Sequence, residues 1–361
     1  GEPIENTLKR GKVSGWKVDQ DGFELGGAVI GLFRFDETEF TEETALMVTE
    51  SNEIGHFEFD KVPAGNFLVR EIAAPKAFVL TEEIFPVEIT EDGQTIEITI
   101  ENQIIKGTAE TIKVDADYPD HKLSGAVFEV YADVDNNGEF NADIDKLAGE
   151  MTETEPGLYQ MKDLVYRNYF LHEKEAPEFF EKDDGYYPFS ITENEAIVRI
   201  ETEAGEGFLN KAQTGSLKVV KTADDDKVEG RTFKISGTDF MGNAYEQEFK
   251  TDENGEINLT LRVGEYTVSE VAGEDSEKYI LPDDQTVEIK AGETTTVKMH
   301  NKLVPEVPSV PQTGDNPWMP AILGTLAGLA VLSGGALLFL RYTGKKRKSA
   351  DQADEDQGTE E

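Results

Sequence analysis

Residues 55–71 read GHFEFDKVPAGNFLVRE. Phe, Val and Leu alternate with polar residues on either side of a Pro-Ala-Gly turn, which is the pattern of two short β-strands joined as a hairpin. The pattern returns as GLYQMKDLVYRNYFLHE at residues 157–173 and as GEINLTLRVGEYTVSE at residues 255–270. Three such stretches, each beginning with Gly and ending with Glu, predict three repeats of one β domain.

Two further landmarks recur with the hairpin. A Lys lies near the start of each repeat, in GWKVD (Lys17), TIKVD (Lys113) and VVKTA (Lys221). IENTLKRG at residues 4–11 aligns with IENQIIKG at residues 100–107, with identical or chemically similar residues at six of eight positions. We therefore expect the sequence to open on the last strand of a preceding repeat. The absence of an initial Met and of an export signal leads to the same expectation of a longer protein.

The expected fold class is all-β. Runs rich in Val, Ile, Phe, Tyr and Thr are broken by Gly, Asp and Asn, and repeats of roughly 90 to 110 residues suit a two-sheet sandwich. The sequence divides into a repeat remnant, three sandwich domains, a Pro-rich spacer with a short motif, one transmembrane helix and a cytoplasmic tail. The expected bounds are 1–11, then 12–106, 107–213 and 214–302, then 303–316, 317–340 and 341–361.

Composition limits the function. The formal charge of -40, from 74 acidic and 34 basic side chains, excludes a nucleic-acid binder and argues against attachment to anionic lipid. The sequence has no Cys, so no disulfide can stabilise domains that we expect to be extracellular. Small domains of this kind need another stabilising device or good cores.

The C-terminal part predicts a membrane anchor. Residues 317–340 carry no charge and are long enough to cross about 30 Å of hydrocarbon as a helix. Basic residues follow between 341 and 348, which places that end in the cytoplasm and the repeats outside the cell.

A short motif precedes this apolar run. Motif, run and basic tail together resemble the sorting signal of Gram-positive surface proteins. The resemblance implies that a sortase cuts after Thr313 and joins it to the peptidoglycan precursor, and that the mature protein is anchored to the cell wall. Val310 departs from the family pattern LPxTG, which leaves the sortase class open, and a plain membrane anchor is the alternative. The motif comprises Val310, Pro311, Gln312, Thr313 and Gly314.

The repeats resemble the Cna B-type, prealbumin-like domains of Gram-positive adhesins and pilins, over almost all of residues 12–302. The resemblance implies an intramolecular isopeptide bond between a Lys on the first strand and an Asn on the last, assisted by a buried Glu in an E-x-x-A-P context. EIAAP at Glu71 and EKEAP at Glu173 fit this context, whereas Glu270 lies in SEVAGED, without the Pro. The matching sets are Lys17, Glu71 and Asn102; Lys113, Glu173 and Asn210; and Lys221, Glu270 and Asn301.

Strand periodicity supports these sites independently. Residues two apart share a face of a strand, so each Glu points with apolar neighbours toward the core. Burial raises the pKa of a carboxyl group and lowers that of an amine, which favours a neutral nucleophile beside a proton donor. For Lys, parity supports burial only at Lys221, because Lys113 shares its face with Thr111 and Asp115. A single Lys or Glu at a strand end is more often solvated, but three recurrences favour the site interpretation.

The second repeat is longer because it contains DVDNNGEFNADID at residues 133–145. This stretch begins like an EF-hand calcium loop, with oxygen-bearing side chains at alternate positions and a Gly at the sixth. The twelfth position is Ile144, however, so a plain acidic hairpin loop is the alternative. The candidate calcium ligands are Asp133, Asp135, Asn137, Asp143 and Asp145.

No enzymatic motif accompanies these features. The four His are scattered, and His172 alternates to the opposite face from Glu173, where we expect it to be exposed. We expect a non-enzymatic stalk of a cell-wall-anchored adhesin, whose other domains would contact host extracellular matrix. One alternative is a pilin subunit, although YPDHK at residues 118–122 does not match a pilin motif. The other is a domain that binds a host ligand itself.

Overall fold

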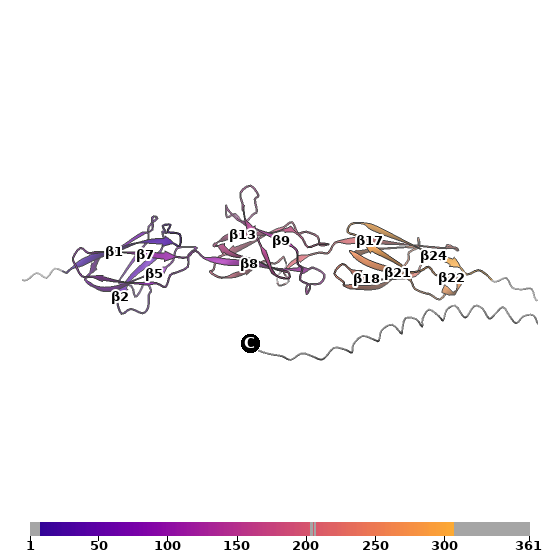
Figure 1. Cartoon of the computed structure of the whole chain (residues 1–361), viewed down its shortest axis with the longest axis horizontal. Coiled ribbons are helices and arrows are strands. Elements are labelled where there is room, and N and C mark those ends of the chain that lie inside the picture. The colour runs from indigo at the N-terminus through magenta and orange to yellow at the C-terminus, as the bar shows by residue number, and fades with distance from the viewer. Residues whose placement is uncertain (1–7, 203–204, 206, 307–361) are drawn as a thin grey trace, which may run out of the picture. The chain divides into compact units, whose positions relative to one another are not determined.

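The computed structural model describes residues 8–306, apart from residues 203, 204 and 206. Their regular structure is β-strand, with one short 3-10 helix, η1, at Ser276–Lys278. The expected all-β class and the repeated sandwich domains are confirmed (Figure 1). The sorting motif, the expected transmembrane helix and the C-terminal tail lie outside the described residues, as does most of the expected remnant. In the part of the chain that is described, no helix has the length and apolar content to cross a membrane.

The first domain consists of two sheets, one with strand order β4-β1-β7 and one with order β3-β2-β5-β6. Its strands are β1 (Arg10–Asp19), β2 (Val29–Arg34), β3 (Met47–Glu50), β4 (His56–Pro63), β5 (Gly65–Ala73), β6 (Ile84–Ile89) and β7 (Thr95–Asn102).

The second domain repeats this arrangement with sheets of order β11-β12-β8-β15 and β10-β9-β13-β14, and β16 pairs with β8 beyond β15. Its strands are β8 (Lys106–Asp115), β9 (Val127–Ala132), β10 (Lys146–Glu150), β11 (Thr152–Glu155), β12 (Leu158–Val165), β13 (Arg167–Glu175), β14 (Tyr186–Ile191), β15 (Ile197–Arg199) and β16 (Phe208–Asn210).

The third domain has sheets of order β20-β17-β24-β22 and β19-β18-β21-β23. Its strands are β17 (Thr214–Ala223), β18 (Thr232–Asp239), β19 (Ala244–Lys250), β20 (Glu256–Arg262), β21 (Gly264–Glu270), β22 (Tyr279–Ile280), β23 (Gln285–Ile289) and β24 (Thr294–Leu303).

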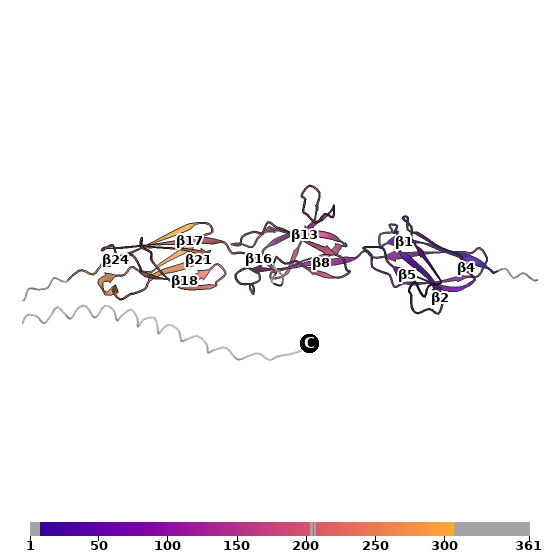
Figure 2. The same cartoon turned by 180° about the vertical axis from the view of Figure 1, so that it is seen from behind.

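Each domain pairs its first strand with its last in parallel. β1 pairs with β7, β8 pairs with β15 and β16, and β17 pairs with β24. Figure 2 shows β17 beside β24 in the third domain. Because a parallel pair needs a long crossover, this topology brings the two ends of each domain sequence together in one sheet.

Apolar residues of the two sheets form a separate core in each domain. Strand β17 shows the cause most clearly, since buried positions alternate along it and place Leu217 and Val219 inside. The equivalent cores contain Val13 and Phe57 in the first domain and Phe128 and Leu171 in the second. Each domain therefore has its own apolar interior, and equivalent strands of the three domains turn equivalent faces toward it.

The Gly that opens each hairpin is required by the backbone. Gly55, Gly157 and Gly255 have φ of 73°, 72° and 77°, in the left-handed region that favours Gly. The carbonyl oxygen of each accepts a hydrogen bond from the backbone N–H of Lys17, Lys113 or Lys221, at 2.7, 2.8 and 2.8 Å. The hairpin Gly and the repeated Lys, two separate landmarks in the sequence, are thus directly bonded in every domain.

Candidate functional site

The nine Lys, Glu and Asn residues assemble into one three-residue cluster in each domain. Lys17 on β1 is paired with Ile100 on β7, and Asn102 lies two residues further along the same face of β7. The second and third domains repeat this register, with Lys113 paired with Phe208 and Lys221 paired with Met299, two residues before the Asn in each case. The Glu comes from the opposite sheet, on β5, β13 or β21. Each cluster therefore joins the two ends of a domain and lies between its two sheets.

In the first domain the three side chains are almost completely buried, with at most 1% of any one exposed. Asn102 Nδ2 donates a hydrogen bond to Glu71 Oε1 at 2.9 Å, and Lys17 Nζ lies 3.8 Å from that oxygen. Lys17 Nζ donates to the carbonyl oxygen of Ile100 at 3.0 Å. The amine is thus held against the strand that carries Asn102.

In the second domain the contacts are closer. Lys113 Nζ lies 3.0 Å from Glu173 Oε1, and Asn210 Nδ2 lies 2.9 and 2.8 Å from the two oxygens of Glu173. The ring centroids of Phe208 and Phe128 lie 4.4 and 5.8 Å from Lys113 Nζ. Aromatic rings therefore exclude water from this cluster.

In the third domain Lys221 Nζ lies 3.1 Å from Glu270 Oε2, and Asn301 Nδ2 donates to Glu270 Oε1 at 2.8 Å. Lys221 and Asn301 are buried, and the Glu270 side chain is 2% exposed. The third copy thus assembles its cluster although its sequence lacks the A-P context.

Burial lowers the pKa of the three amines. Desolvation is the largest cause and lowers the pKa of Lys17 and of Lys113 to about 8, against the opposing charges of Glu71 and Glu173. The pKa of Lys221 is lowered for the same reason, opposed by Glu270. Each amine therefore loses its proton more readily than a solvated Lys, which is the state in which nitrogen is a nucleophile.

The clusters also contain buried polar atoms without hydrogen-bond partners. The carbonyl oxygens Oδ1 of Asn102, Asn210 and Asn301 accept no hydrogen bond, and Lys113 Nζ and Lys221 Nζ contact Glu at ion-pair distance without hydrogen-bond geometry. Buried polar groups are normally satisfied, and an exception at the same atom in three domains indicates a chemical role. The unsatisfied groups include an amine and an amide carbonyl, which are the groups that would react with each other, and in the third domain also Glu270 Oε2.

The E-x-x-A-P segment has a clear structural role in the first two domains. After Pro75 and Pro177 the chain turns through Ala77 and Phe179, which have left-handed φ of 76° and 64°. The turn brings the backbone N–H of Thr81 to Glu71 Oε2 at 3.1 Å. In the second domain the N–H of Asp183 reaches Glu173 Oε2 at 2.8 Å. The motif thus builds a turn that supplies a donor to the buried Glu.

One expectation about a neighbouring residue, the exposure of His172, was wrong, and strand parity gave no guidance at Lys113. Thr111 and Asp115 are fully buried, so the polar face of Lys113 does not indicate exposure. Thr111 Oγ1 donates to the carbonyl oxygen of Ile200, and Asp115 pairs with Arg262, a partner 147 residues away. His172 is only 8% exposed, since its ring stacks on Tyr186 and its Nδ1 lies 3.0 Å from the carbonyl oxygen of Gly185.

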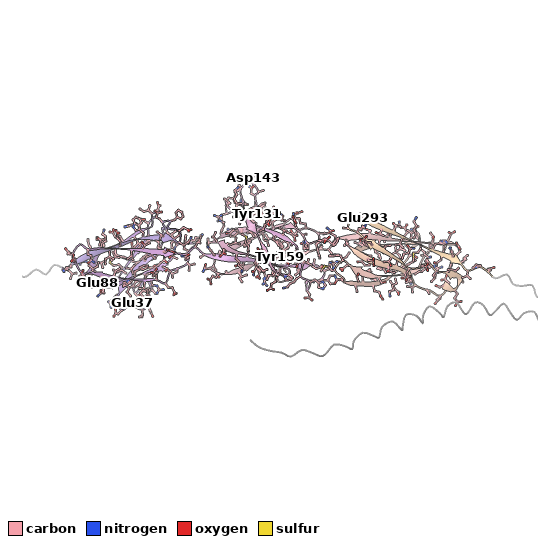
Figure 3. The ribbon with its side chains drawn as sticks, in the orientation of Figure 1. Glu37, Glu88, Tyr131, Asp143, Tyr159 and Glu293 are labelled. Atoms are coloured by element: carbon pink, nitrogen blue, oxygen red, sulfur yellow. The ribbon has the colours of Figure 1, made fainter. Side chains whose placement is uncertain are left out.

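The acidic stretch at residues 133–145 forms the loop between β9 and β10. Carboxylate oxygens of Asp133, Asp135 and Asp145 lie within 4.8 Å of one another. Asn137 is beside this group and donates through Nδ2 to Asp135 Oδ2 at 2.9 Å. Asp143 is exposed at the outer end of the loop and is not a member of the group (Figure 3).

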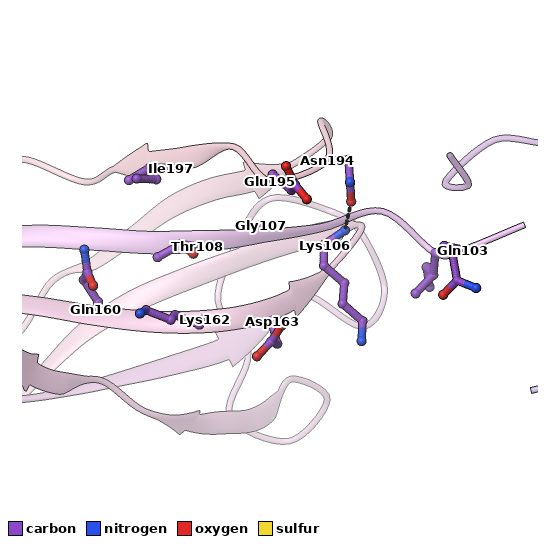
Figure 4. A pocket seen from close by; sticks show the side chains of 11 residues that line it. Gln103, Lys106, Gly107, Thr108, Gln160, Lys162, Asp163, Asn194, Glu195 and Ile197 are labelled. Atoms are coloured by element: carbon purple, nitrogen blue, oxygen red, sulfur yellow. Dashed lines mark hydrogen bonds between the residues drawn. The ribbon is translucent and has the colours of Figure 1, made fainter. Parts of the chain in front are cut away.

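A groove of about 600 Å³ lies where the first and second domains are connected. Its lining is mixed and includes the charged residues Lys106, Lys162 and Asp163 as well as Ile104 and Ile197 (Figure 4). None of the nine Lys, Glu and Asn residues lines it. The buried clusters are therefore separate from this surface groove.

Comparison with solved structures gives the following likenesses. A structure of the Bacillus anthracis TIE protein is 24% identical with a TM-score of 0.60, and the match covers 81% of this chain and 51% of that one. The chain thus spans about half the length of that relative, and the likeness shows the fold.

Two pilin structures also match. BcpA, the major pilin subunit of Bacillus cereus, is 16% identical with a TM-score of 0.36, covering 82% of this chain and 100% of that one. The major pilin SpaD from Corynebacterium diphtheriae is 14% identical with a TM-score of 0.25, covering 82% and 98%.

No curated protein sequence matches the chain. A family of domains described as SpaA, prealbumin-like fold domain, matches residues 11–104, 107–206 and 215–303. These matches cover most of the chain, and each falls on one of the three sandwiches; the first and third contain a complete Lys, Glu and Asn cluster, and the second contains Lys113 and Glu173 and ends four residues before Asn210. The chain therefore belongs to the SpaA prealbumin-like fold domain family, of which it carries three copies in tandem.

Proposed function

We propose that this chain is a stalk segment of a Gram-positive cell-surface protein, and that each of its domains closes an isopeptide bond between Lys and Asn. The observation that carries the proposal is the recurrence of a buried Lys, Glu and Asn cluster at one register in three domains. Burying two ionisable groups and an amide is costly for stability, so their presence in all three copies without a use for them is not expected. A structural, non-enzymatic role fits, because each cluster is sealed inside its own domain.

The reaction needs only the residues of the cluster. Transfer of one proton from Lys113 to Glu173 leaves a neutral amine and a carboxylic acid 3.0 Å apart. The side-chain amide of Asn210 then turns so that Oδ1 accepts a hydrogen bond from the protonated Glu173, which polarises the carbonyl group.

Bond formation follows from that arrangement. Lys113 Nζ attacks the amide carbon of Asn210, a new carbon–nitrogen bond forms, and Glu173 passes a proton from the attacking nitrogen to the leaving one. The original carbon–nitrogen bond breaks and ammonia leaves, so the products are one secondary amide and one ammonia per domain. The proton first taken from Lys113 stays on Glu173 when neutral ammonia leaves, so Glu173 is a carboxylic acid before and after the attack and acts as a proton shuttle during bond formation.

The position of the bond explains its mechanical use. It joins the first strand to the last within one sheet, so tension applied along the chain passes through the bond and not through the interior of the domain. A cross-link over 85 residues, the separation of Lys17 and Asn102, also restricts the unfolded state. By the chain-entropy model such a loop stabilises a domain by roughly 4 to 5 kcal/mol. In a chain without Cys, this bond would take the place of disulfides.

The mass of the intact protein tests the proposal. We expect the protein to weigh three ammonias less than its sequence, and Glu71→Gln, Glu173→Gln and Glu270→Gln each to restore one ammonia. Glu175→Gln is the matched control, because Glu175 lies on the same strand as Glu173 and is exposed. A wild-type protein with full sequence mass would contradict the isopeptide bonds and leave the family and fold unchanged.

Attachment to the cell wall is proposed from the sequence of residues 310–348. Thr313 would become the new C-terminus, joined by a sortase to the peptidoglycan precursor. We expect wall-digesting enzymes to release protein that ends at Thr313, and detergent alone to release none. Release by detergent of protein that retains peptides with Trp318 would contradict anchoring.

The same experiment separates the stalk from a pilin subunit. A stalk is released as one species of defined mass after complete wall digestion, whereas a polymerised subunit gives a ladder of covalent multimers. We expect a single species. A ladder that persists in denaturant would overturn the stalk proposal in favour of a pilus.

A further inference from the structure

The loop between β9 and β10 in the second domain has features that the cross-link does not use. Asp133 and Asp145, at the two ends of the loop, are 2% and 4% exposed, although carboxylates are rarely buried without a partner. A carboxylate oxygen from each, and one from Asp135, lie within 4.8 Å of one another. Three negative groups are thus held together at one place in the fold.

The backbone of the loop satisfies part of this group. Asp145 accepts hydrogen bonds from the backbone N–H of Val134 at 3.0 Å and of Asn141 at 2.7 Å. Asp133 Oδ2 accepts one from Gly138 at 3.0 Å, where φ of 78° requires a left-handed turn. The loop therefore wraps around the carboxylates with its N–H groups turned inward.

One buried oxygen is left without a partner. Asp133 Oδ1 accepts no hydrogen bond, although Asp133 is only 2% exposed. Among the described residues, no Lys, Arg or His forms an ion pair with Asp133, Asp135 or Asp145. Three carboxylates this close together, two of them buried, repel one another, and a cation between them would offset that repulsion.

The loop is also anchored on its domain. The Phe140 ring stacks on Tyr186 with centroids 3.6 Å apart and contacts the Tyr131 and Phe170 rings. Asn168 Nδ2 donates to Asn136 Oδ1 at 2.6 Å. The carboxylates thus sit in a pre-formed loop, fixed to β13 and β14 by aromatic packing.

We propose that this loop binds one calcium ion through Asp133, Asp135 and Asp145, with loop carbonyl groups and water completing the shell. Hard oxygen ligands suit calcium or magnesium, and two ligands of one ion are separated by at most twice the metal–oxygen distance. That limit is roughly 4.6 to 5.2 Å for calcium, so carboxylate oxygens that lie within 4.8 Å of one another can share one calcium ion. Asp145 follows the twelfth loop position, Ile144, and replaces the usual closing ligand there.

Titration calorimetry on the full chain, after removal of metal by a chelator, tests this site with CaCl₂ and MgCl₂ as the probes. We expect one equivalent of calcium, with an affinity on the order of that of extracellular modules, about 10⁻⁴ to 10⁻³ M. Asp133→Asn and Asp135→Asn should each weaken binding by about tenfold or more, since each removes a charged ligand. Asp135→Asn is the safer variant for folding, because Asp135 is exposed and, among the described residues, its carboxylate accepts hydrogen bonds only from Asn137.

Asp143→Asn is the matched control, since it removes the same charge from the same loop outside the carboxylate group. We expect this variant to keep its affinity within about twofold, as for a solvated charge. No binding to the wild type at millimolar calcium would overturn the proposal, and so would equal weakening by Asp143→Asn and Asp135→Asn. Equal binding of magnesium would contradict the choice of ion. The number of ammonias lost is unaffected by any of these outcomes, so the site and the cross-links are tested separately.

Discussion

The second and third domains contain the same Lys, Glu and Asn cluster but hold its Glu differently. Glu173 Oε2 accepts a hydrogen bond from the backbone N–H of Asp183 at 2.8 Å, in addition to that from Asn210. Glu270 Oε2 is buried with no hydrogen-bond partner and has only the amine of Lys221 at 3.1 Å. An identical set of reacting groups is thus supported by a backbone donor in one domain and not in the other.

The difference follows from the chain after the Glu. Pro177 begins a turn whose backbone returns to the Glu, whereas the third domain has the helix η1 and the strand β22 in that part of the chain. There, Arg231 and Asp275 form an ion pair, which fixes the segment from the outside. The E-x-x-A-P context is therefore a device that positions the Glu, and a cluster can assemble without it.

Removal of the reacting Asn should have the largest effect. We expect Asn210→Ala to destabilise the second domain by roughly 4 to 5 kcal/mol, because the cross-link over nearly the whole domain is lost. Asn301→Ala should cost the third domain a similar amount if that domain is fully cross-linked. Calorimetric melting of the full chain, with mass measured in parallel, gives both values.

Asn258→Ala is the control for this comparison, since Asn258 lies exposed on β20 of the third domain. Its free energy of unfolding should stay within about 0.5 kcal/mol of the wild-type value, as is usual for surface substitutions. A wild-type protein lacking only two ammonias, together with a harmless Asn301→Ala, would show that the third cluster assembles but does not react.

The fold and the cluster residues were readable from the sequence because they depend on local periodicity and on repetition. Each Glu lies two residues after a core position on its strand. One such Glu could equally be solvated, but its presence in three copies indicates that it is buried. The burial of Lys113 could not be read in this way, since Thr111 and Asp115 beside it are polar. Their partners, Ile200 and Arg262, are distant in sequence, and only the folded chain brings them together.

Substitution of the hairpin Gly should have the next largest effect. In Gly255→Ala the new Cβ would lie 2.6 Å from the carbonyl oxygen of Lys221, in a residue with φ of 77°. We expect the free energy of unfolding to fall by about 2 to 3 kcal/mol, the sum of the strain of a left-handed Ala and the cost of displacing strand β17, which carries Lys221. Denaturant unfolding of the third domain measures it.

Gly242→Ala separates the two causes. Gly242 has φ of 86° in the same domain, but nothing lies within 4 Å of the added Cβ. This variant should lose only about 1 kcal/mol, the cost of the left-handed conformation. Equal losses for Gly255→Ala and Gly242→Ala would mean that the contact with Lys221 contributes nothing.

The turn after the Glu should affect the rate of bond formation and not its final extent. We expect Pro177→Ala to slow ammonia loss in the second domain by up to about tenfold, the equivalent of one positioning hydrogen bond. The third domain, which has no such turn, should be unaffected and slower than the wild-type second domain. Mass measured at intervals after a pulse of cell-free synthesis follows both. Faster reaction in the third domain would contradict a positioning role for the turn.

Some features of the acidic loop were equally hard to read. Asp143 and Asp145 flank Ile144 symmetrically, and the sequence could not decide which one points inward. The structure distinguishes them because Asp145 caps two backbone N–H groups of its own loop, whereas Asp143 does not. Local hydrogen bonding of this kind depends on loop conformation, which strand periodicity does not describe.

The pH dependence of the free energy of unfolding should distinguish a reacted Lys from an unreacted one. Of the changes in stability predicted here, this is expected to be the smallest. In Asn210→Ala the amine of Lys113 stays free, and its pKa is lowered to about 8 in the fold from 10.5. Between these values the unfolded state binds more protons, so stability of the second domain should rise with pH from about 8 to 10.5. The slope cannot exceed about 1.4 kcal/mol per pH unit, the limit for one proton. Below pH 8 the amine is protonated in both the folded and the unfolded state, and this slope disappears.

The wild-type protein is the control. Its Lys113 nitrogen is an amide and does not titrate, so a matched melting series should lack the rise. A rise in the wild-type second domain would contradict the bond there.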